Sequence, residues 1–165
     1  MTEFNEEESG TVGLRDKIFH LDPADIGLAE ADFGHPVWGM VMETGYSDFS
    51  YTLLVLAEGT VSLYLSNGGG IIGGGEHDSV REVAGHFLSA AQAFYTHAKP
   101  VTDFPVPADG EVRFYFLTYN GVQLYSGQEE VFGNDQDDLS QLFYIAHGVI
   151  SELRMLETDP ESVAD

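Results

Sequence analysis

The 165-residue sequence contains no cysteine, which excludes disulfide bonds, thiolate zinc sites and a cysteine nucleophile. Basic residues are also scarce: six Lys and Arg stand against 28 Asp and Glu, and the formal net charge is −22. The six bases are scattered singly along the chain, whereas neutralising a row of phosphates requires clustered Lys or Arg. We therefore expect neither nucleic acid nor a membrane surface as a partner.

Long hydrophobic runs are missing as well. The longest nearly unbroken apolar stretch, at about 53–57, is far shorter than the roughly 20 residues of a membrane-spanning helix. The chain begins with MTEFNEEESG, which has neither the basic and apolar regions of a secretory signal nor the basic character of a transit peptide. The sequence therefore predicts a cytoplasmic location.

The sequence does contain enough apolar residues for a core. Hydrophobic residues make up 43% of the chain, so the acids are expected to coat a folded protein. The length fits one domain, and we expect a single α+β domain at 11–157 between disordered acidic ends at 1–10 and 158–165. Eight of the acids lie near the two ends, which leaves 20 acids against six bases in the body.

Hydrophobic periodicity divides the body into strands and helices. A period of two indicates five strands, and the last two flank Asn120-Gly121, a pair typical of the type I′ turn of a hairpin. A helical period indicates two long helices, of which the first opens with a capping box at Ser79-Val80-Arg81-Glu82 and stops before Pro100. The expected strands are 37–44, 49–57, 61–65, 112–118 and 122–126, and the expected helices are 11–19, a short one after Asp22-Pro23, 79–98, and one from Asp137 or Asp138 to about 156.

These elements predict an antiparallel sheet of about five strands with two long amphipathic helices on one face, in the order β-β-β-α-β-β-α. The order resembles that of profilin-like and roadblock/longin-type sandwiches, which is a resemblance of fold and implies no function. The two halves share a hairpin–loop–helix plan, with hairpin turns at Gly59 and Gly121 and helix-opening acids at Asp78 and Asp138. An internal ββα repeat and the ordinary reuse of this order in small α+β domains are the two interpretations.

Several expected strands are apolar on both sides, so both faces of the sheet need cover. Two helices cover one face only. The second face is expected to meet either a second copy of the protein or another protein partner, or else to lie under residues 11–36 of the same chain. Tyrosine is favoured at interfaces, and the expected interface residues are Tyr115, Leu117, Tyr119 and Tyr125.

A glycine-rich loop follows the first hairpin. Gly68-Gly69-Gly70-Ile71-Ile72-Gly73 matches the G-x-G-x-x-G string of dinucleotide sites, but the preceding strand belongs to an antiparallel hairpin and not to a parallel βαβ unit. Glycines that allow positive φ and close backbone approach are the favoured interpretation. The candidate ligand or partner loop comprises Gly68, Gly69, Gly70, Ile71, Ile72, Gly73, Gly74, Gly75, Glu76 and His77.

No other pattern amounts to a catalytic or metal constellation. Glu76 beside His77 offers an acid–base pair or two metal ligands, although such a pair at a helix start is common without chemistry. The acidic stretch 129–138 lacks the EF-hand spacing and favours helix capping in a solvated turn. His147 lies beside the apolar stripe of the last helix, where a hydrogen-bonded core histidine is the usual outcome. We expect no metal, no cofactor and no enzyme activity, because neither H-E-x-x-H nor G-x-S-x-G occurs.

The sequence therefore predicts a non-catalytic protein-interaction module, either an inhibitor-like or immunity-like protein that meets a basic partner or a self-associating homodimer. The alternative is a small-ligand-binding or catalytic domain that uses the Gly68–Gly75 loop with Glu76 and His77. A third interpretation is that the acidic coat maintains solubility in a high-salt cytoplasm and has no partner.

Overall fold

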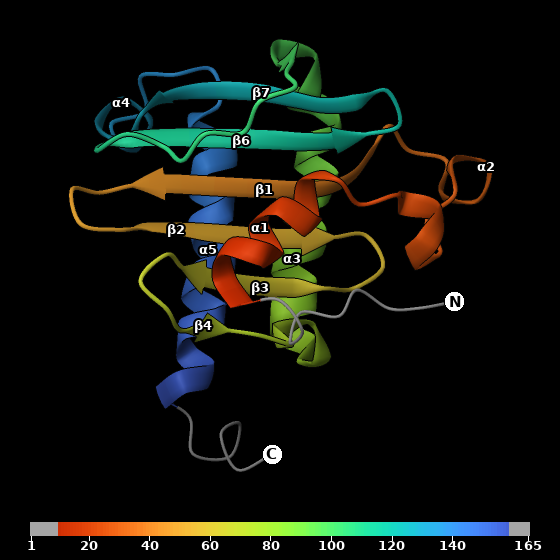
Figure 1. The fold of residues 1–165 in the computed structure, drawn as a ribbon, viewed down its shortest axis with the longest axis horizontal. Helices are drawn as coiled ribbons and strands as arrows, with labels where there is room; N and C mark the ends of the chain where they lie inside the picture. Colours follow the sequence, from red (N-terminus) through yellow and green to blue (C-terminus); the bar gives the residue numbers. More distant parts are fainter. Residues whose placement is uncertain (1–9, 159–165) are drawn as a thin grey trace.

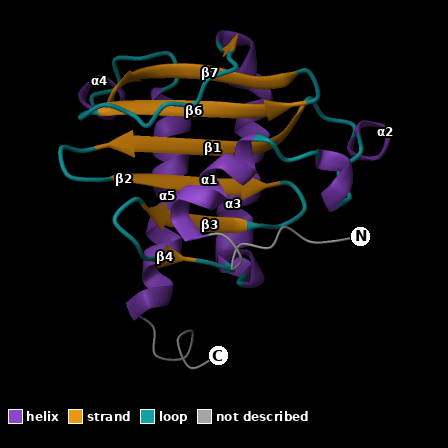
Figure 2. Ribbon diagram, in the orientation of Figure 1, coloured by secondary structure: helices purple, strands orange, loops and turns teal. Residues whose placement is uncertain are grey.

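An antiparallel sheet of seven strands, in the order β4-β3-β2-β1-β6-β7-β5, forms the middle layer of the computed structural model, which describes residues 10–158 (Figure 1). The long helices α3 (Asp78–Phe94) and α5 (Ser140–Thr158) lie on one face of the sheet, and the N-terminal helix α1 (Gly10–Phe19) lies on the other (Figure 2). The predicted disordered ends fall outside the described residues, except for Gly10 and Thr158. In the described part of the chain, no helix is long and apolar enough to cross a membrane.

All five predicted strands are present, as β1 (Val37–Gly45), β2 (Ser50–Leu56), β3 (Val61–Leu65), β6 (Glu111–Thr118) and β7 (Gly121–Gln128). The sheet is larger than predicted because β4 (Gly70–Ile71) and β5 (Lys99–Pro100), each two residues long, pair onto its opposite edges. β1 is central and pairs with β2 on one side and β6 on the other. The two hairpins thus flank β1, and an origin by ββα duplication stays a prediction.

The turn between β6 and β7 differs from the predicted one. Thr118 pairs with Gly121, so the turn residues are Tyr119 and Asn120. Of the predicted pair Asn120-Gly121, only Gly121 has a positive φ, at +104°, whereas a type I′ turn needs two such residues. The type I′ prediction is therefore wrong: the turn lies one residue earlier, and neither Tyr119 nor Asn120 has a positive φ.

The structure contradicts the predicted N-terminal cap of α3 and has an acidic cap at the start of α5. His77 is the N-cap of α3 and its side chain makes no capping hydrogen bond, and Ser79 already lies inside the helix, so the capping box predicted at Ser79–Glu82 is wrong. Of the two acids predicted at the start of α5, the structure uses Asp137 and not Asp138, since Asp137 Oδ1 accepts a hydrogen bond from the Leu139 backbone N–H at 2.9 Å. Ser140 Oγ accepts in turn from the Asp137 N–H at 3.1 Å.

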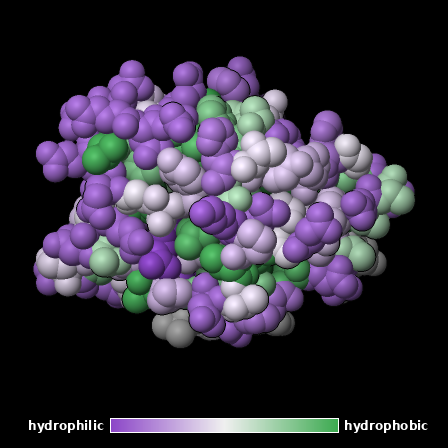
Figure 3. Space-filling view, turned by 90° about the horizontal axis from the view of Figure 1, so that it is seen from above, coloured by the Kyte–Doolittle hydropathy of each residue, from purple (hydrophilic) through white to green (hydrophobic). Residues whose placement is uncertain are grey.

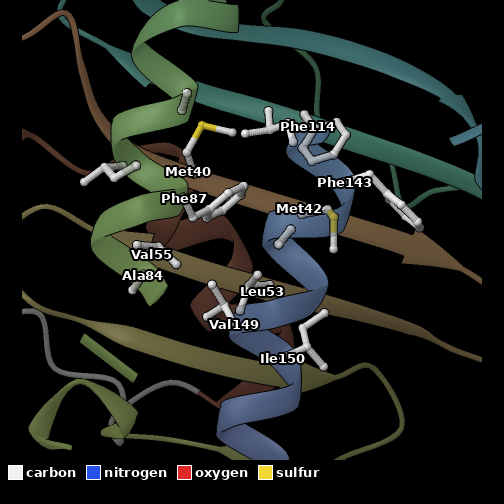
Figure 4. Close-up of a cluster of buried hydrophobic side chains, with 14 of the residues drawn as sticks. Met40, Met42, Leu53, Val55, Ala84, Phe87, Phe114, Phe143, Val149 and Ile150 are labelled. Atoms are coloured by element: carbon white, nitrogen blue, oxygen red, sulfur yellow. The ribbon is translucent and has the colours of Figure 1, made fainter. Parts of the chain in front are cut away.

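The face under α3 and α5 holds the larger core. Phe87 of α3 and Phe143, Val149 and Ile150 of α5 point toward the sheet (Figure 4). A short helix, α4 (Glu129–Gly133), replaces part of the predicted acidic loop and buries Phe132 completely against the same core. The sheet side chains of this cluster that Figure 4 labels are Met40, Met42, Leu53, Val55 and Phe114.

The opposite face of the sheet is covered by the chain itself. α1 and the 3-10 helix η2 (Pro23–Ile26) lay apolar side chains over it, and the short helix α2 (Glu30–Phe33) follows them. The prediction that residues 11–36 cover this face is confirmed for the side chains that the structure describes, and cover by a second copy or another protein is not needed for it. The covering side chains are Leu14, Ile18, Phe19, Ile26 and Leu28, and they meet Trp38, Val41, Leu54, Leu56, Tyr64, Tyr115 and Leu117 of the sheet.

The four expected interface residues do not share one uncovered face. Tyr115 is 0% and Leu117 is 1% exposed beneath the N-terminal cover. Tyr119 donates its hydroxyl hydrogen to the Leu28 carbonyl at 2.6 Å. Tyr125 faces the α5 side instead, where its hydroxyl donates to Asp137. A partner contact stays a prediction, and one through Tyr115 and Leu117 would require the N-terminal cover to move away.

Candidate functional site

The glycine-rich loop is folded onto the edge of the sheet. Gly68 and Gly69, with φ of +101° and +88°, form the turn that leads into β4. A Cβ at Gly75 would lie 1.8 Å from the Gly59 carbonyl oxygen in the β2–β3 turn. A Cβ at Gly74 would similarly meet Leu153 of α5. The glycines therefore provide positive φ and close backbone contact, and the loop is packed against its neighbours.

Glu76 and His77 end this loop at the start of α3. Glu76 closes the 3-10 helix η3 (Gly74–Glu76) and is exposed, and His77 is half-buried as the N-cap of α3. Within residues 10–158, no three His, Asp or Glu side chains are grouped so that they could hold a metal ion. Ile72, between the two glycine runs, is 50% exposed.

A cavity of about 460 Å³ opens beside the same loop, between α5 and the β4 edge of the sheet. Residues of the β1–β2 and β3–β4 turns line it, and both turns lie at the same end of the sheet, on the left in Figure 1. Its volume is within the range of small-molecule sites. This cavity, named the α5 pocket, is lined by Tyr46, Phe49, Tyr51, Leu63, Leu65, Asn67, Gly70, Ile71, His147, Ile150 and Arg154.

One end of the α5 pocket is aromatic and forms hydrogen bonds. The Tyr51 hydroxyl lies 3.4 Å from Nε2 of His147, and the Tyr46 hydroxyl donates to Glu129 Oε2 at 3.2 Å. Burial lowers the pKa of His147, and the Glu129 carboxylate opposes this only in part, so the imidazole is neutral at pH 7. Burial raises the pKa of Tyr51 and of Tyr46, so both hydroxyls keep their protons. A neutral imidazole that accepts the Tyr51 hydrogen at Nε2 carries its own proton on Nδ1.

The other end of the α5 pocket is cationic. His147, Ile150 and Arg154 line the pocket from one side of α5, and the seven-residue separation of His147 and Arg154 corresponds to about 10 Å of helix. Arg154 is exposed and has neither a hydrogen bond nor an acidic partner among the side chains described at 13–156. The lining contains no carboxylate, although acids outnumber bases 20 to six over the same range. The pocket thus joins a hydrogen-bonding end and a cationic end through an apolar middle.

A second cavity, of about 440 Å³, lies on the α1 face, but its strongest polar group is already occupied. Arg15 donates to both carboxylate oxygens of Glu43 at 2.8 Å and also to the carbonyls of Phe104 and Pro105. The Glu43 side chain is fully buried and accepts a further hydrogen bond from Thr52 at 2.6 Å. We interpret this cluster as a clamp that holds α1 and residues 102–106 against the sheet.

The polar groups of the α5 pocket were not predicted from the sequence. These groups form no motif, because they lie up to 108 residues apart in the chain: Tyr46, Tyr51, His147 and Arg154. Two partial signals existed. The glycine loop does contribute Gly70 and Ile71 to the lining, and His147 was expected to be a hydrogen-bonded histidine. The residues expected to act with the loop, Glu76 and His77, do not line the pocket.

No protein-family model, curated protein sequence or solved structure matches this chain. The geometry of the described residues is the basis on which a function can be proposed.

Proposed function

We propose that this protein binds a small organic molecule in the α5 pocket. The observation that carries the proposal is the lining, a concave and mostly apolar surface in which the hydrogen-bonded pair Tyr51 and His147 faces a single cation, Arg154. Pockets of this volume that have a few convergent polar groups and perturbed pKa values are typical of ligand sites. Gly70 and Ile71 in the lining support the part of the sequence prediction that assigned the glycine loop to a ligand.

The apolar walls set the strength expected for a simple probe. A phenyl-bearing fragment that removes roughly 150 Å² of apolar area from water gains about 4 kcal/mol, before the costs of ordering it. Because the ordering costs subtract from this gain, a dissociation constant of about 1 mM is the upper limit of the affinity expected from the apolar walls alone. Weak but saturable binding is therefore the prediction for a fragment, and a natural ligand would bind more tightly through its polar groups.

Protein-observed NMR tests the proposal on the full chain. The neutral probe 4-phenylbutan-1-ol is titrated into ¹⁵N-labelled protein, and we expect saturable shifts at the amides of Leu65, Ile71 and His147. The proposal is overturned if no saturable shift occurs below about 5 mM probe. Shifts centred on Phe19 and Thr52 in the α1-side cavity would overturn it equally.

A matched pair of turn variants tests whether a bulky side chain at the edge of the α5 pocket weakens binding of the alcohol. Asn67 lines the α5 pocket from the exposed β3–β4 turn, and Asn120 is an exposed residue of the β6–β7 turn. We expect Asn67→Trp to weaken binding of the alcohol at least several-fold and Asn120→Trp to leave it unchanged. Equal effects of the two variants would contradict the assignment.

An acidic protein-interaction module is the second candidate function, and a different observation favours it. Three ion pairs, Arg15–Glu43, Arg81–Asp78 and Arg113–Glu111, engage half of the bases, so outside them 17 acids stand against three bases among residues 13–156. Hydrophilic residues cover most of the β7 side of the molecule (Figure 3). The end of the sheet beside α4 carries Asp109, Glu111, Glu129, Glu130 and Asp135. Such a surface accelerates association with a basic protein.

A charged peptide distinguishes a docking surface from a general coat. With an oligolysine peptide, we expect shifts that concentrate at 109–111 and 129–138, and shifts spread evenly over the exposed acids would refute a docking surface. Glu130→Lys should weaken binding more than Asp32→Lys, because both residues lie in the first turn of a short helix but only Glu130 lies at this end. A purely monomeric chain in sedimentation at micromolar concentration would refute the homodimer.

A further inference from the structure

We infer that the α5 pocket takes a monoanionic amphiphile, a carboxylate on an apolar body about 10 Å long, whose carboxylate meets Arg154 and whose tail extends toward Tyr51 and His147. The inference rests on the proposed function and adds to it the chemical class of the ligand. It follows from three features of the lining: its charge, its polarity from end to end and its apolar middle.

The charge of the lining favours an anion. Arg154 is the only charged side chain among the lining residues, and the acidic surroundings have not supplied it with a partner among the side chains described at 13–156. A guanidinium offers paired N–H donors that match the two oxygens of a carboxylate. A ligand carboxylate would therefore provide the counter-charge that the chain does not.

The difference in charge between the two ends of the α5 pocket determines which way round the ligand binds. At the end opposite Arg154, the Tyr46 hydroxyl is already bonded to Glu129, whose carboxylate would repel a second carboxylate placed there. The same end offers Tyr51 and His147, which are neutral and suit an apolar tail or a hydroxyl or keto group on it. An anion is thus attracted to one end and disfavoured at the other.

The apolar middle sets a dependence on length. Leu63, Leu65, Ile71 and Ile150 form the wall between the two polar ends. Each methylene that enters this wall region should tighten binding about fourfold, which is the fold-change equivalent of ~0.8 kcal/mol per buried methylene. A series from butanoate to octanoate should show this increase, and a flat series would overturn the inference.

The decisive experiment compares three probes with one skeleton: 4-phenylbutyrate, 4-phenylbutan-1-ol and 4-phenylbutylamine. They are titrated into the ¹⁵N-labelled full chain at about 0.15 M ionic strength, where charges beyond about 8 Å are screened. We expect the carboxylate to bind about fivefold more tightly than the alcohol, as an exposed charge pair contributes, and the amine to bind more weakly than both. Arg154→Gln should reduce the affinity of the carboxylate to that of the alcohol.

Lys99→Gln is the matched control, because it removes the same single charge from β5 at the far edge of the sheet. It should leave the fivefold preference intact. If the alcohol binds in the α5 pocket but the carboxylate binds no better, or if Arg154→Gln leaves the preference unchanged, the inference is wrong and the proposed function stands. If none of the three probes binds in the pocket, both are wrong. Arg154 is exposed, so its variant is expected to fold, and the dispersion of the NMR spectrum verifies this.

Discussion

Replacing Arg15 with leucine tests the clamp that holds α1 over the sheet. Glu43 accepts three hydrogen bonds from side chains, two from Arg15 and one from Thr52, and its side chain is 0% exposed. Arg15→Leu leaves this carboxylate in a low-dielectric site without its counter-charge. It also removes the bonds from α1 to the carbonyls of Phe104 and Pro105.

The expected cost follows from the exposure of the two partners. Removing one partner of a fully buried ion pair costs about 3–5 kcal/mol. The Arg15 side chain is 20% exposed, so water can enter the vacated space, and we expect a loss of about 2–3 kcal/mol in the free energy of unfolding. Glu43→Gln should cost less, about 1–2 kcal/mol, because an unpaired Arg15 keeps its carbonyl partners and reaches solvent.

Urea unfolding provides the measurement, followed by circular dichroism and by the fluorescence of Trp38, the single tryptophan, which is buried on the same face. The double variant should lose less than the sum of the two single losses, by about 1–2 kcal/mol. A loss below about 0.5 kcal/mol for Arg15→Leu, which is typical of surface positions, would refute the clamp. Strict additivity would refute the coupling of Arg15 to Glu43.

Three further predictions concern the loop and the titrating groups. Gly75→Ala should destabilise the protein by about 3 kcal/mol, since its Cβ would lie 1.8 Å from the Gly59 carbonyl oxygen. Gly85→Ala, in open space on α3, should instead stabilise the protein by up to ~1 kcal/mol. Urea unfolding of both variants measures the two changes. Burial lowers the pKa of His147 below the ordinary value of about 6.5, so the unfolded chain takes up the proton first as the pH falls. The Tm should therefore fall as the pH drops below about 6.5, and it should fall less steeply in His147→Gln. Burial and the hydrogen bond to Asp137 raise the pKa of Tyr125 to about 12 from an ordinary value of 10.0. The stability that protonated Tyr125 contributes is therefore present below pH 10 and is lost as the pH rises toward 12. Tyr125→Phe should flatten the dependence of Tm on pH over that window, and an unchanged slope would contradict the assignment.

The elements with local signals were predictable from the sequence. α3 carries its buried residues at helical spacing, and β2, β3, β6 and β7 alternate or run apolar between clear turn residues. The two additional strands were not predictable, since β4 and β5 are two residues long and form only because a neighbouring strand offers its edge. The start of α5 was predicted to within one residue, at Asp137 or Asp138, because the side chain of an acid at a helix start bonds a local backbone group, as Asp137 does.

Which face of the sheet a side chain lies on, and what covers that face, could not be predicted from local sequence patterns. Tyr125 was expected beside Tyr115, but Tyr125 pairs with Phe114, so the two tyrosines project from opposite faces. The cover over Tyr115 depends on Arg15 and Glu43, which are 28 residues apart, and no pattern in the sequence links them. The α5 pocket depends likewise on the register of β2 and β3 and on which side of α5 meets their ends. These relations arise from packing between distant segments.

Intermolecular NOEs decide whether the α5 pocket is a ligand site. With 4-phenylbutan-1-ol in exchange with the full chain, we expect NOEs from the phenyl protons to the methyl groups of Leu65, Ile71 and Ile150, all of which line the pocket. NOEs to Ile18 and Val106 in the α1-side cavity, or no intermolecular NOE at saturating probe, would contradict it.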